Sequence, residues 1–327
     1  MITTFLYDRA TGNLERGLGP ERFGEVLADP GKLLWVDLEN PDETEYAILK
    51  DRFDFHPLLI RDCIDPQNFP KCDDMNSYIF LVLHSLYYYL DKREEEALSI
   101  REIDIFAGSN YLITVHAGHI KAVTANRKRL EHSDKIMRQG TGRLLYHLVD
   151  SIVDNYMAII HTLTEKADVL EDNVLAGCKP DQSNRILSLR RNTMTMRKTL
   201  LPQTELIYNF SHGKINFVKP EELIYFRDIY DHMTRIADLV DHLREMSHSL
   251  LEAYHSSLSF KLNDVMRILT VIATIMMPMT LISGIGGMNV LFPLHLRETM
   301  LGFWIFIFLM ALSVSVLLYW FKKIKLL

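Results

Sequence analysis

Two long runs without a charged side chain lie near the C-terminal end of this 327-residue chain, at residues 268–294 and 299–321. A helix crosses the hydrocarbon core of a bilayer, about 30 Å thick, with roughly 20 predominantly apolar residues. Each run supplies that length. The pattern therefore predicts two membrane-spanning helices behind a large water-soluble region.

The leading region is polar, so the mean hydropathy of +0.01 averages a water-soluble part with an extremely apolar C-terminal part. The first residues lack the basic stretch and the apolar core of a signal peptide. We therefore expect the leading region to stay in the cytoplasm.

Basic residues beside the two runs predict their orientation. Lys322, Lys323 and Lys325 follow the second run, and Lys261 and Arg267 precede the first. Short flanks rich in Lys and Arg stay on the cytoplasmic side of a membrane. Both termini are expected in the cytoplasm, and the chain is expected in the inner (plasma) membrane.

Cysteine usage and charge limit the classes of partner. Cys63, Cys72 and Cys178 form no CxxC pair, which favours reduced thiols over a disulfide framework or a zinc site. The formal net charge of −6 argues against nucleic acid. No P-loop indicates a nucleotide, and no Ser/His/Asp, HExxH or Gly-rich phosphate motif indicates an enzyme, so we expect no catalytic residues.

Short segments rich in β-branched and aromatic residues predict strands of one sheet at residues 33–38, 78–83, 103–106 and 111–115. Between the first two strands, Asn40-Pro41-Asp42-Glu43 indicates a capped helix start. Pro41 is expected in the first turn of that helix, and the acidic residues favour the positive end of its dipole.

The pattern becomes helical after residue 140. Apolar residues then recur at three- and four-residue spacing, at Leu144, Leu148, Ile152 and Tyr156. A break at residues 179–181 separates this helix from a second one at residues 182–210.

A third helix is predicted from about Glu221, since no Gly interrupts the chain before Gly284 and Pro278 is its only Pro. Roughly 60 residues at 1.5 Å each reach about 90 Å, which exceeds any bilayer span. The first half must therefore stand in the cytoplasm as a stalk. So long a helix with polar residues on several faces needs neighbours, which predicts a homo-oligomeric bundle.

One face of this helix, at its membrane end, combines small, thioether and polar residues. Its members are Asn263, Met266, Leu269, Ala273, Met277, Thr280 and Gly284. In a symmetric oligomer this face would line a passage with polar ends and an apolar middle that can gate by dewetting. The same residue types also pack helix against helix in lipid. Spacing alone leaves both interpretations open.

This part of the chain resembles a known family. Residues 262–280, followed by Gly287-Met288-Asn289, look like the first membrane helix and the signature loop of the CorA divalent-cation channels. The tripeptide is specific here because it stands at the outer end of the first of two C-terminal spans. Further matches are residues 225–232, His56-Pro57-Leu58 and Asp62-Cys63.

The resemblance implies an α+β cytoplasmic domain with α/β/α layers, followed by long stalk helices and two C-terminal transmembrane helices, in a funnel-shaped homopentamer. The first transmembrane helix of each subunit would line the pore. The implied function is uptake of Mg²⁺, with Co²⁺ or Ni²⁺ as surrogates, down the membrane potential. No nucleotide is required for that transport.

The resemblance also assigns the residues of the ion path. Gly287, Met288 and Asn289 would form the selectivity filter. Because Mg²⁺ releases its waters reluctantly, neutral oxygens of Asn289 would recognise the hydrated ion and release it readily. Polar stations would follow at Thr280 and Asn263, with apolar collars at Met277, Leu269 and Met266.

Regulation in this family uses cytoplasmic cations between subunits, and the matching metal ligands are Asp62 and Asp228, with Asp150 as a candidate for an adjacent site. Bound Mg²⁺ would hold the ring closed, and its loss would leave carboxylates that repel one another. The structural alternative is a solvated Asp228 that pairs with Arg227 or Arg235. Arg61 stands where the family often has an acidic residue.

Two departures from the family pattern concern the ion. Gly286 and Val290 replace aromatic residues beside the tripeptide, and the loop that follows is not acidic, which weakens the concentration of cations. Similarity to the ZntB transporters leaves Zn²⁺, with proton coupling, as an alternative in which His295 would bind metal or titrate. A second alternative is a non-conducting, membrane-anchored metal sensor.

The expected organisation divides the chain into six parts. They are a cytoplasmic α/β domain (1–140), a cytoplasmic helical hairpin (141–219), a stalk helix continuing into the first transmembrane helix (220–285), an outer loop (286–298), the second transmembrane helix (299–321) and a basic cytoplasmic tail (322–327).

Overall fold

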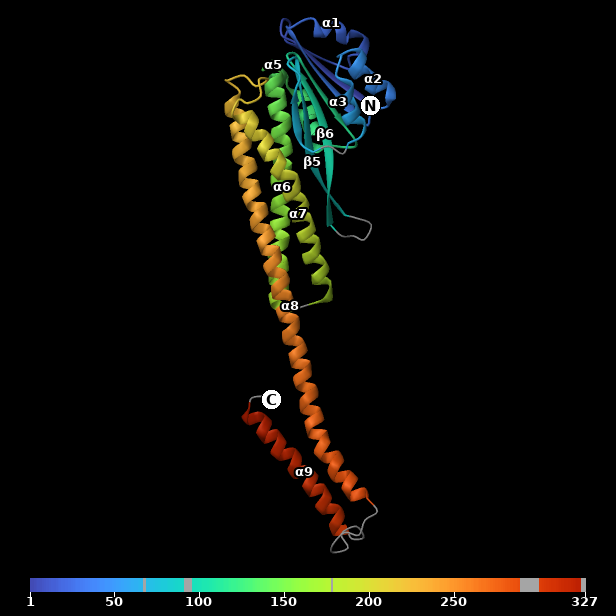
Figure 1. Ribbon diagram of the computed structural model, residues 1–327, viewed down its shortest axis with the longest axis vertical. Helices are drawn as coiled ribbons and strands as arrows, with labels where there is room; N and C mark the ends of the chain where they lie inside the picture. The colour runs from blue at the N-terminus through green and yellow to red at the C-terminus, as the bar shows by residue number, and fades with distance from the viewer. Residues whose placement is uncertain (67–68, 91–95, 178, 289–299, 325–327) are drawn as a thin grey trace. The chain divides into compact units, whose positions relative to one another are not determined.

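A computed structural model describes residues 1–66, 69–90, 96–177, 179–288 and 300–324 of the chain (Figure 1). The chain forms two compact units, Met1–Leu251 and Glu252–Leu327. The first contains a sheet and most of the helices. The second contains two apolar helical segments.

One seven-stranded sheet forms the centre of the first unit, in the order β2-β1-β3-β7-β6-β5-β4. Only β3 and β7 pair in parallel, and the other neighbours are antiparallel. The strands are β1 (Ile2–Asp8), β2 (Asn13–Arg16), β3 (Lys32–Glu39), β4 (Lys71–Asp74), β5 (Tyr78–Leu90), β6 (Glu96–Gly108) and β7 (Tyr111–His116).

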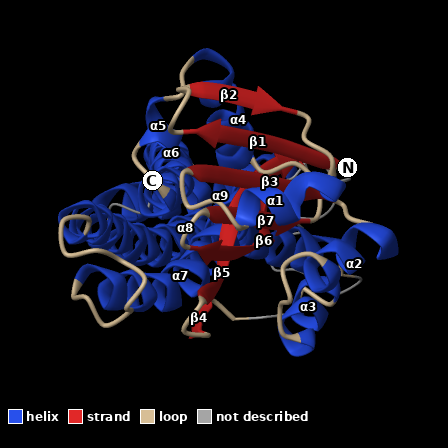
Figure 2. Ribbon diagram, turned by 90° about the horizontal axis from the view of Figure 1, so that it is seen from above, coloured by secondary structure: helices blue, strands red, loops and turns tan. Residues whose placement is uncertain are grey.

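Helices cover both faces of this sheet (Figure 2). Alternate residues of β3 point to opposite faces: Leu34, Val36 and Leu38 join the core beneath α1 (Phe23–Leu27), α2 (Glu43–Asp51) and α3 (Pro57–Ile64). The other face contacts α6 (Thr141–Ala176) and α7 (Pro180–Ser211), while α4 (Lys121–His132) and α5 (Lys135–Arg138) pack on α6. The predicted α/β/α layers are confirmed.

The predicted strands lie within β3, β5, β6 and β7, but β1, β2 and β4 were missed. The expected place of Pro41 was wrong. Asp42 is the N-cap of α2, where its Oδ1 accepts from the Glu45 backbone N–H at 2.8 Å, and Pro41 precedes this cap. The helix start is therefore a capping box, without proline in the first turn.

Long helices complete the first unit. The N-terminal part of α8 (Leu223–Gly287) buries a stripe at three- and four-residue spacing. The stripe consists of Phe226, Ile229, Met233, Ile236, Val240 and Leu243. Phe226 stacks on Phe210 of α7 with ring centroids 5.2 Å apart, and Arg197 of α7 pairs with Asp241 at 2.7 Å.

The second unit contains the C-terminal part of α8 and α9 (Met300–Lys323). Both helices are long and apolar enough to cross a membrane. Their large apolar side chains are exposed, as Met277 at 74% and Phe308 at 65% illustrate. Exposure of so much apolar surface to water is unfavourable, whereas lipid or further subunits would cover it.

A buried polar network joins β3, β7 and α4. The fully buried carboxylate of Asp37 accepts hydrogen bonds from the Thr114 hydroxyl and the Arg127 guanidinium, and its Oδ1 lies 3.2 Å from Nε2 of His116. The Trp35 indole N–H donates to Thr114 at 3.2 Å. These contacts pair the buried Asp37 carboxylate and the buried Trp35 indole N–H, whose burial without partners would cost free energy.

We expect Asp37→Ala to lower the free energy of unfolding by about 3 kcal/mol, because the mutation leaves the Arg127 charge in a largely buried site without its main partner. Denaturant unfolding of the detergent-solubilised protein, followed through its circular dichroism, measures the change. The control is Glu15→Ala, which breaks an exposed ion pair with Arg22 and should cost at most about 1 kcal/mol. Equal midpoints for both variants would refute the structural role of Asp37.

Candidate ion path and carboxylate sites

Four of the seven residues proposed for the pore lie along one groove on α8. Ala273, Met277, Thr280 and Gly284 line it together with Met276, Leu281, Ile285 and Met288, and its volume is about 670 Å³. The other three, Asn263, Met266 and Leu269, are exposed nearer the N-terminal end of this segment and are not among its lining residues.

The groove offers few polar atoms. The Thr280 hydroxyl donates to the Met276 carbonyl oxygen at 2.9 Å, so its proton is used within the helix. Its oxygen lone pairs remain as acceptors. Waters around a small cation donate hydrogen bonds outward, so Thr280 is suited to a hydrated ion rather than a bare one.

The tripeptide lies only partly within the described residues. Gly287 is the last residue of α8, and the Met288 backbone N–H donates to the Ile285 carbonyl at 3.1 Å. Asn289, Val290 and His295 lie outside the described residues. Gly286 has a local role, because a Cβ there would lie 3.3 Å from the Phe306 ring of α9.

Asp62 lies on α3 and already has a cationic neighbour. Its Oδ2 is 2.7 Å from Nζ of Lys71, which is also 3.0 Å from Asp73. The Asp62 side chain is 29% exposed. A metal ion at Asp62 would therefore have to displace the Lys71 ammonium group or share the Asp62 carboxylate with it.

Asp228 and Asp150 lie on neighbouring helices, α8 and α6. Asp228 faces Nε2 of His232 at 3.9 Å, so the predicted pairing with Arg227 or Arg235 was wrong. Burial, followed by the Asp154 carboxylate, raises the pKa of Asp150, and Asp228 acts in the same direction. The carboxylates of Asp150, Asp154 and Asp228 thus share one region of the first unit.

Within the part of the chain that the structure describes, no group of three or more His, Cys, Asp or Glu side chains is arranged to hold a metal ion. The described cysteines are also poor thiolate ligands. Burial raises the pKa of Cys72 to about 12 and that of Cys63 as well. Cys178 lies outside the described residues.

A pair of acidic residues on β6, of which Asp104 is buried, was not recognised from the sequence. Asp104 is 3% exposed, it hydrogen-bonds the side chains of Glu102 and Cys63, and its Oδ1 has no partner among the described residues. Burial, followed by the Glu102 charge, raises the pKa of Asp104. The signal was present, because period-two alternation puts Asp104 on the same face as the core residue Phe106.

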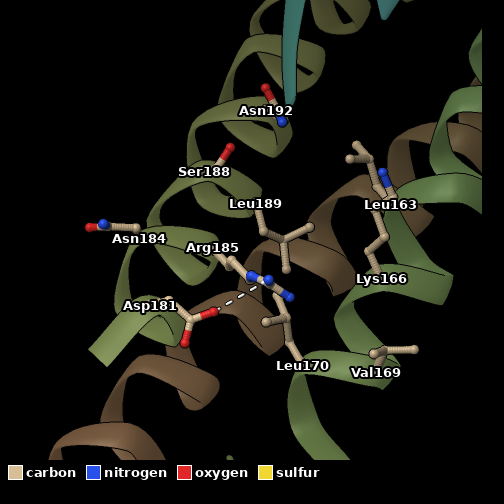
Figure 3. Close-up of a pocket in the computed structure, with 10 residues that line it drawn as sticks. All are labelled: Leu163, Lys166, Val169, Leu170, Asp181, Asn184, Arg185, Ser188, Leu189 and Asn192. Atoms are coloured by element: carbon tan, nitrogen blue, oxygen red, sulfur yellow. Dashed lines mark ion pairs between the residues drawn. The ribbon is translucent and has the colours of Figure 1, made fainter. Parts of the chain in front are cut away.

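A pocket of about 540 Å³ lies between α6 and α7 and includes none of the predicted site residues (Figure 3). Leu163, Leu170 and Leu189 form its apolar part. Arg185 pairs with Asp181 at 3.3 Å beside it. Lys166 donates to the Tyr88 hydroxyl, so this lysine is already engaged.

The chain combines a mixed α/β unit with two helices that are long and apolar enough to cross a membrane. The sequence matches the CorA-like Mg²⁺ transporter protein family over residues 30–323, and the chain belongs to this family.

Individual relatives agree with this assignment. YfjQ of Bacillus subtilis is 33% identical over 291 residues, 88% of each chain. The cobalt/magnesium transport protein CorA of Thermotoga maritima is 32% identical over 293 residues, 89% of this chain and 82% of that one. The solved CorA magnesium transporter of Methanocaldococcus jannaschii shares the fold, with a TM-score of 0.80 at 23% identity over 98% and 97% of the two chains.

We expect Asp104→Asn to flatten the pH dependence of stability. A folded-state pKa above the ordinary value of about 4 means that the folded protein holds this proton more tightly, so stability falls as pH rises toward the folded pKa. The thermal midpoint of the wild type relative to the variant should therefore decline as pH rises above about 4. The control is Asp51→Asn, at an exposed position, and a constant wild-type-to-variant difference would contradict the prediction.

Proposed function

We propose that the protein is a homopentameric channel that mediates Mg²⁺ uptake across the inner membrane, with both termini in the cytoplasm. The observation that carries this proposal is the groove on α8, in which Ala273, Met277, Thr280 and Gly284 lie on one exposed face. The chain belongs to a family of Mg²⁺ transporters. In a symmetric oligomer of such a transporter, this face of α8 from each subunit would line a pore along the symmetry axis.

The chemistry of the proposed path suits a hydrated ion. Thr280 and Asn263 provide neutral oxygen acceptors, and Met277, Leu269 and Met266 provide apolar collars. Neutral acceptors bind a divalent ion less tightly than carboxylates do, which permits release. The membrane potential supplies about 4.6 kcal/mol for a divalent ion that crosses 100 mV.

Asp62 and Asp228 are the proposed regulatory ligands, held by different subunits, with Asp150 beside Asp228. A metal ion bound between subunits would take one carboxylate from each of several chains, so a single chain need not contain three ligands close together. The described residues of this chain contain no such group of three. At high cytoplasmic Mg²⁺ the bridges would close the ring. At low Mg²⁺ the carboxylates would repel one another and release it.

Asn289→Ala should abolish Mg²⁺ flux into proteoliposomes while leaving the oligomer intact, because the filter loses the amide oxygens that recognise the hydrated ion. Native mass measurement checks the assembly, and Asn184→Ala, an exposed amide on α7, is the matched control. Full flux from Asn289→Ala would falsify the filter assignment.

Parallel uptake of Co²⁺, Ni²⁺ and Zn²⁺, measured with and without a pH gradient, separates the Mg²⁺ channel from a proton-coupled zinc transporter and from a metal sensor that conducts no ion.

Asp228→Ala should be less protected against limited proteolysis at millimolar Mg²⁺ than the wild type is, because a bridging ligand is lost. Asp172→Ala, another exposed helical carboxylate, serves as the control and should behave like the wild type. Identical protection of wild type and Asp228→Ala would show that Asp228 is not a sensor ligand.

A further inference from the structure

The last turn of α8, where the proposed filter begins, has a sequence that does not favour a helix. Gly284, Gly286 and Gly287 lie within the last four residues of α8, and glycine is among the least favourable residues for a helix. The Met288 backbone N–H donates to the Ile285 carbonyl at 3.1 Å, which is the three-residue spacing of a helix end. This end therefore depends on a contact from outside the helix.

The second apolar helix, α9, supplies such a contact. A Cβ on Gly286 would lie 3.3 Å from the Phe306 ring, so the ring lies against the backbone of α8 at this glycine. A Cβ on Gly284 or Gly287 would meet no described atom within 4 Å. Of these three glycines, Gly286 is thus the one whose missing side chain makes room for α9.

This contact is one end of a longer seam between the two helices. From residue 271 to 288 of α8, the residues that are not exposed recur at three- and four-residue spacing, and the same holds along α9. On α8 they are Val271, Thr274, Ile275, Pro278, Met279, Ile282 and Gly286, and on α9 they are Gly302, Phe306, Met310, Ser313, Val314, Leu317 and Phe321. These two sets form the α8–α9 seam.

The seam and the groove occupy different faces of α8. The described residues that line the groove all come from α8, and none of them belongs to the seam. Ala273, Met277 and Thr280 of the proposed ion path therefore lie on a face of α8 other than the one that contacts α9. In this arrangement α9 supports the helix that would line the pore.

We propose that Phe306 is a positioning residue for the filter, because its ring against Gly286 holds the last turn of α8, with Gly287 and Met288, on α9. The proposal rests on the proposed function in that the tripeptide is taken to select the ion. Recognition of a hydrated ion by neutral oxygens depends on where those oxygens lie. Phe306 would thus affect the choice of ion without contacting the ion.

The first test requires no transport. A water-soluble maleimide labels a Met288→Cys variant of the full-length protein in lipid nanodiscs, and the labelling rate reports how often the last turn of α8 opens. Cys72 and Cys178 are replaced by Ser, and Cys63 is left in place because it is only 5% exposed. The same protein without the Met288→Cys change gives the background labelling.

Phe306→Ala should raise the labelling rate of Met288→Cys about tenfold, because the last turn loses the ring that holds it. Gly286→Leu should act in the same direction, because its side chain would overlap with the ring. The double variant Gly286→Leu, Phe306→Ala should return to within about twofold of the parent, since the leucine fills the space that the ring leaves. Unchanged rates in the single variants, or multiplied effects in the double variant, would overturn the proposal.

Phe321→Ala is the matched control. It removes the same ring from the same helix at the other end of the seam, where Phe321 is 3% exposed. We expect it to lower the thermal midpoint at least as much as Phe306→Ala does and to leave the labelling of Met288→Cys unchanged. If both variants accelerated labelling equally, Phe306 would only stabilise the helix pair, and the positioning role would be overturned.

The second test is uptake of Mg²⁺ and Co²⁺ into proteoliposomes. Phe306→Ala should change the ratio of the two uptake rates about threefold, because specificity is a difference between two affinities that a displaced filter alters unequally. Phe321→Ala should keep the ratio of the wild type. A change in labelling without a change in the ratio would overturn the role of Phe306 in ion choice. Full flux from Asn289→Ala would instead overturn the filter assignment, while the labelling rates would still decide the contact between Gly286 and Phe306.

Discussion

The apolar surface of the last two helices cannot be covered within one chain. Only about 6% of the most apolar window of α8 and of α9 is buried. Burial of apolar side chains is the main favourable term in folding, so a protein that leaves this much uncovered requires another apolar environment. Lipid satisfies part of the requirement. In the proposed pentamer, a neighbouring subunit would cover the groove on α8, whose small and hydroxyl residues permit close helix packing.

The first unit buries acidic side chains, which is unfavourable unless they are paired or neutral. Two buried carboxyl groups of the same sheet differ in this respect. The buried carboxylate of Asp37 is paired with Arg127, His116 and Thr114. Burial, followed by the Glu102 charge, raises the pKa of Asp104, which favours its neutral form. Each arrangement follows from the cost of an unpaired charge in a medium of low polarity.

The surface carboxylates differ in the same way. Lys71 pairs with Asp62 within the chain, whereas Asp150 has both the carboxylates of Asp154 and Asp228 and the side chains of His232 and Arg129 near it. In the proposed regulation, a divalent metal between subunits would add positive charge beside Asp62 and Asp228.

The sequence by itself determined the class of the protein. Long uncharged runs, the absence of Gly before Gly284 and the position of the tripeptide identified the two apolar helices and the family, since membrane length and helix continuity are local properties. It also predicted the four central strands, whose apolar residues reflect burial on both faces. It missed β1, β2 and β4. Of these, β2 and β4 are short edge strands of sequence NLER and KCDD, which are held by backbone pairing rather than by apolar alternation.

Only the tertiary structure decided which charges have partners. Sequence spacing suggested Arg227 or Arg235 for Asp228, but the i,i+4 neighbour His232 faces it. Lys71 of β4 pairs with Asp62 of α3, and the Asp104 side chain of β6 hydrogen-bonds Cys63 of α3. The contacts of Asp104 with Cys63 and of Asp37 with Arg127 join residues far apart in the chain. Electrostatic energy depends on distance in space, which no local pattern of residues encodes.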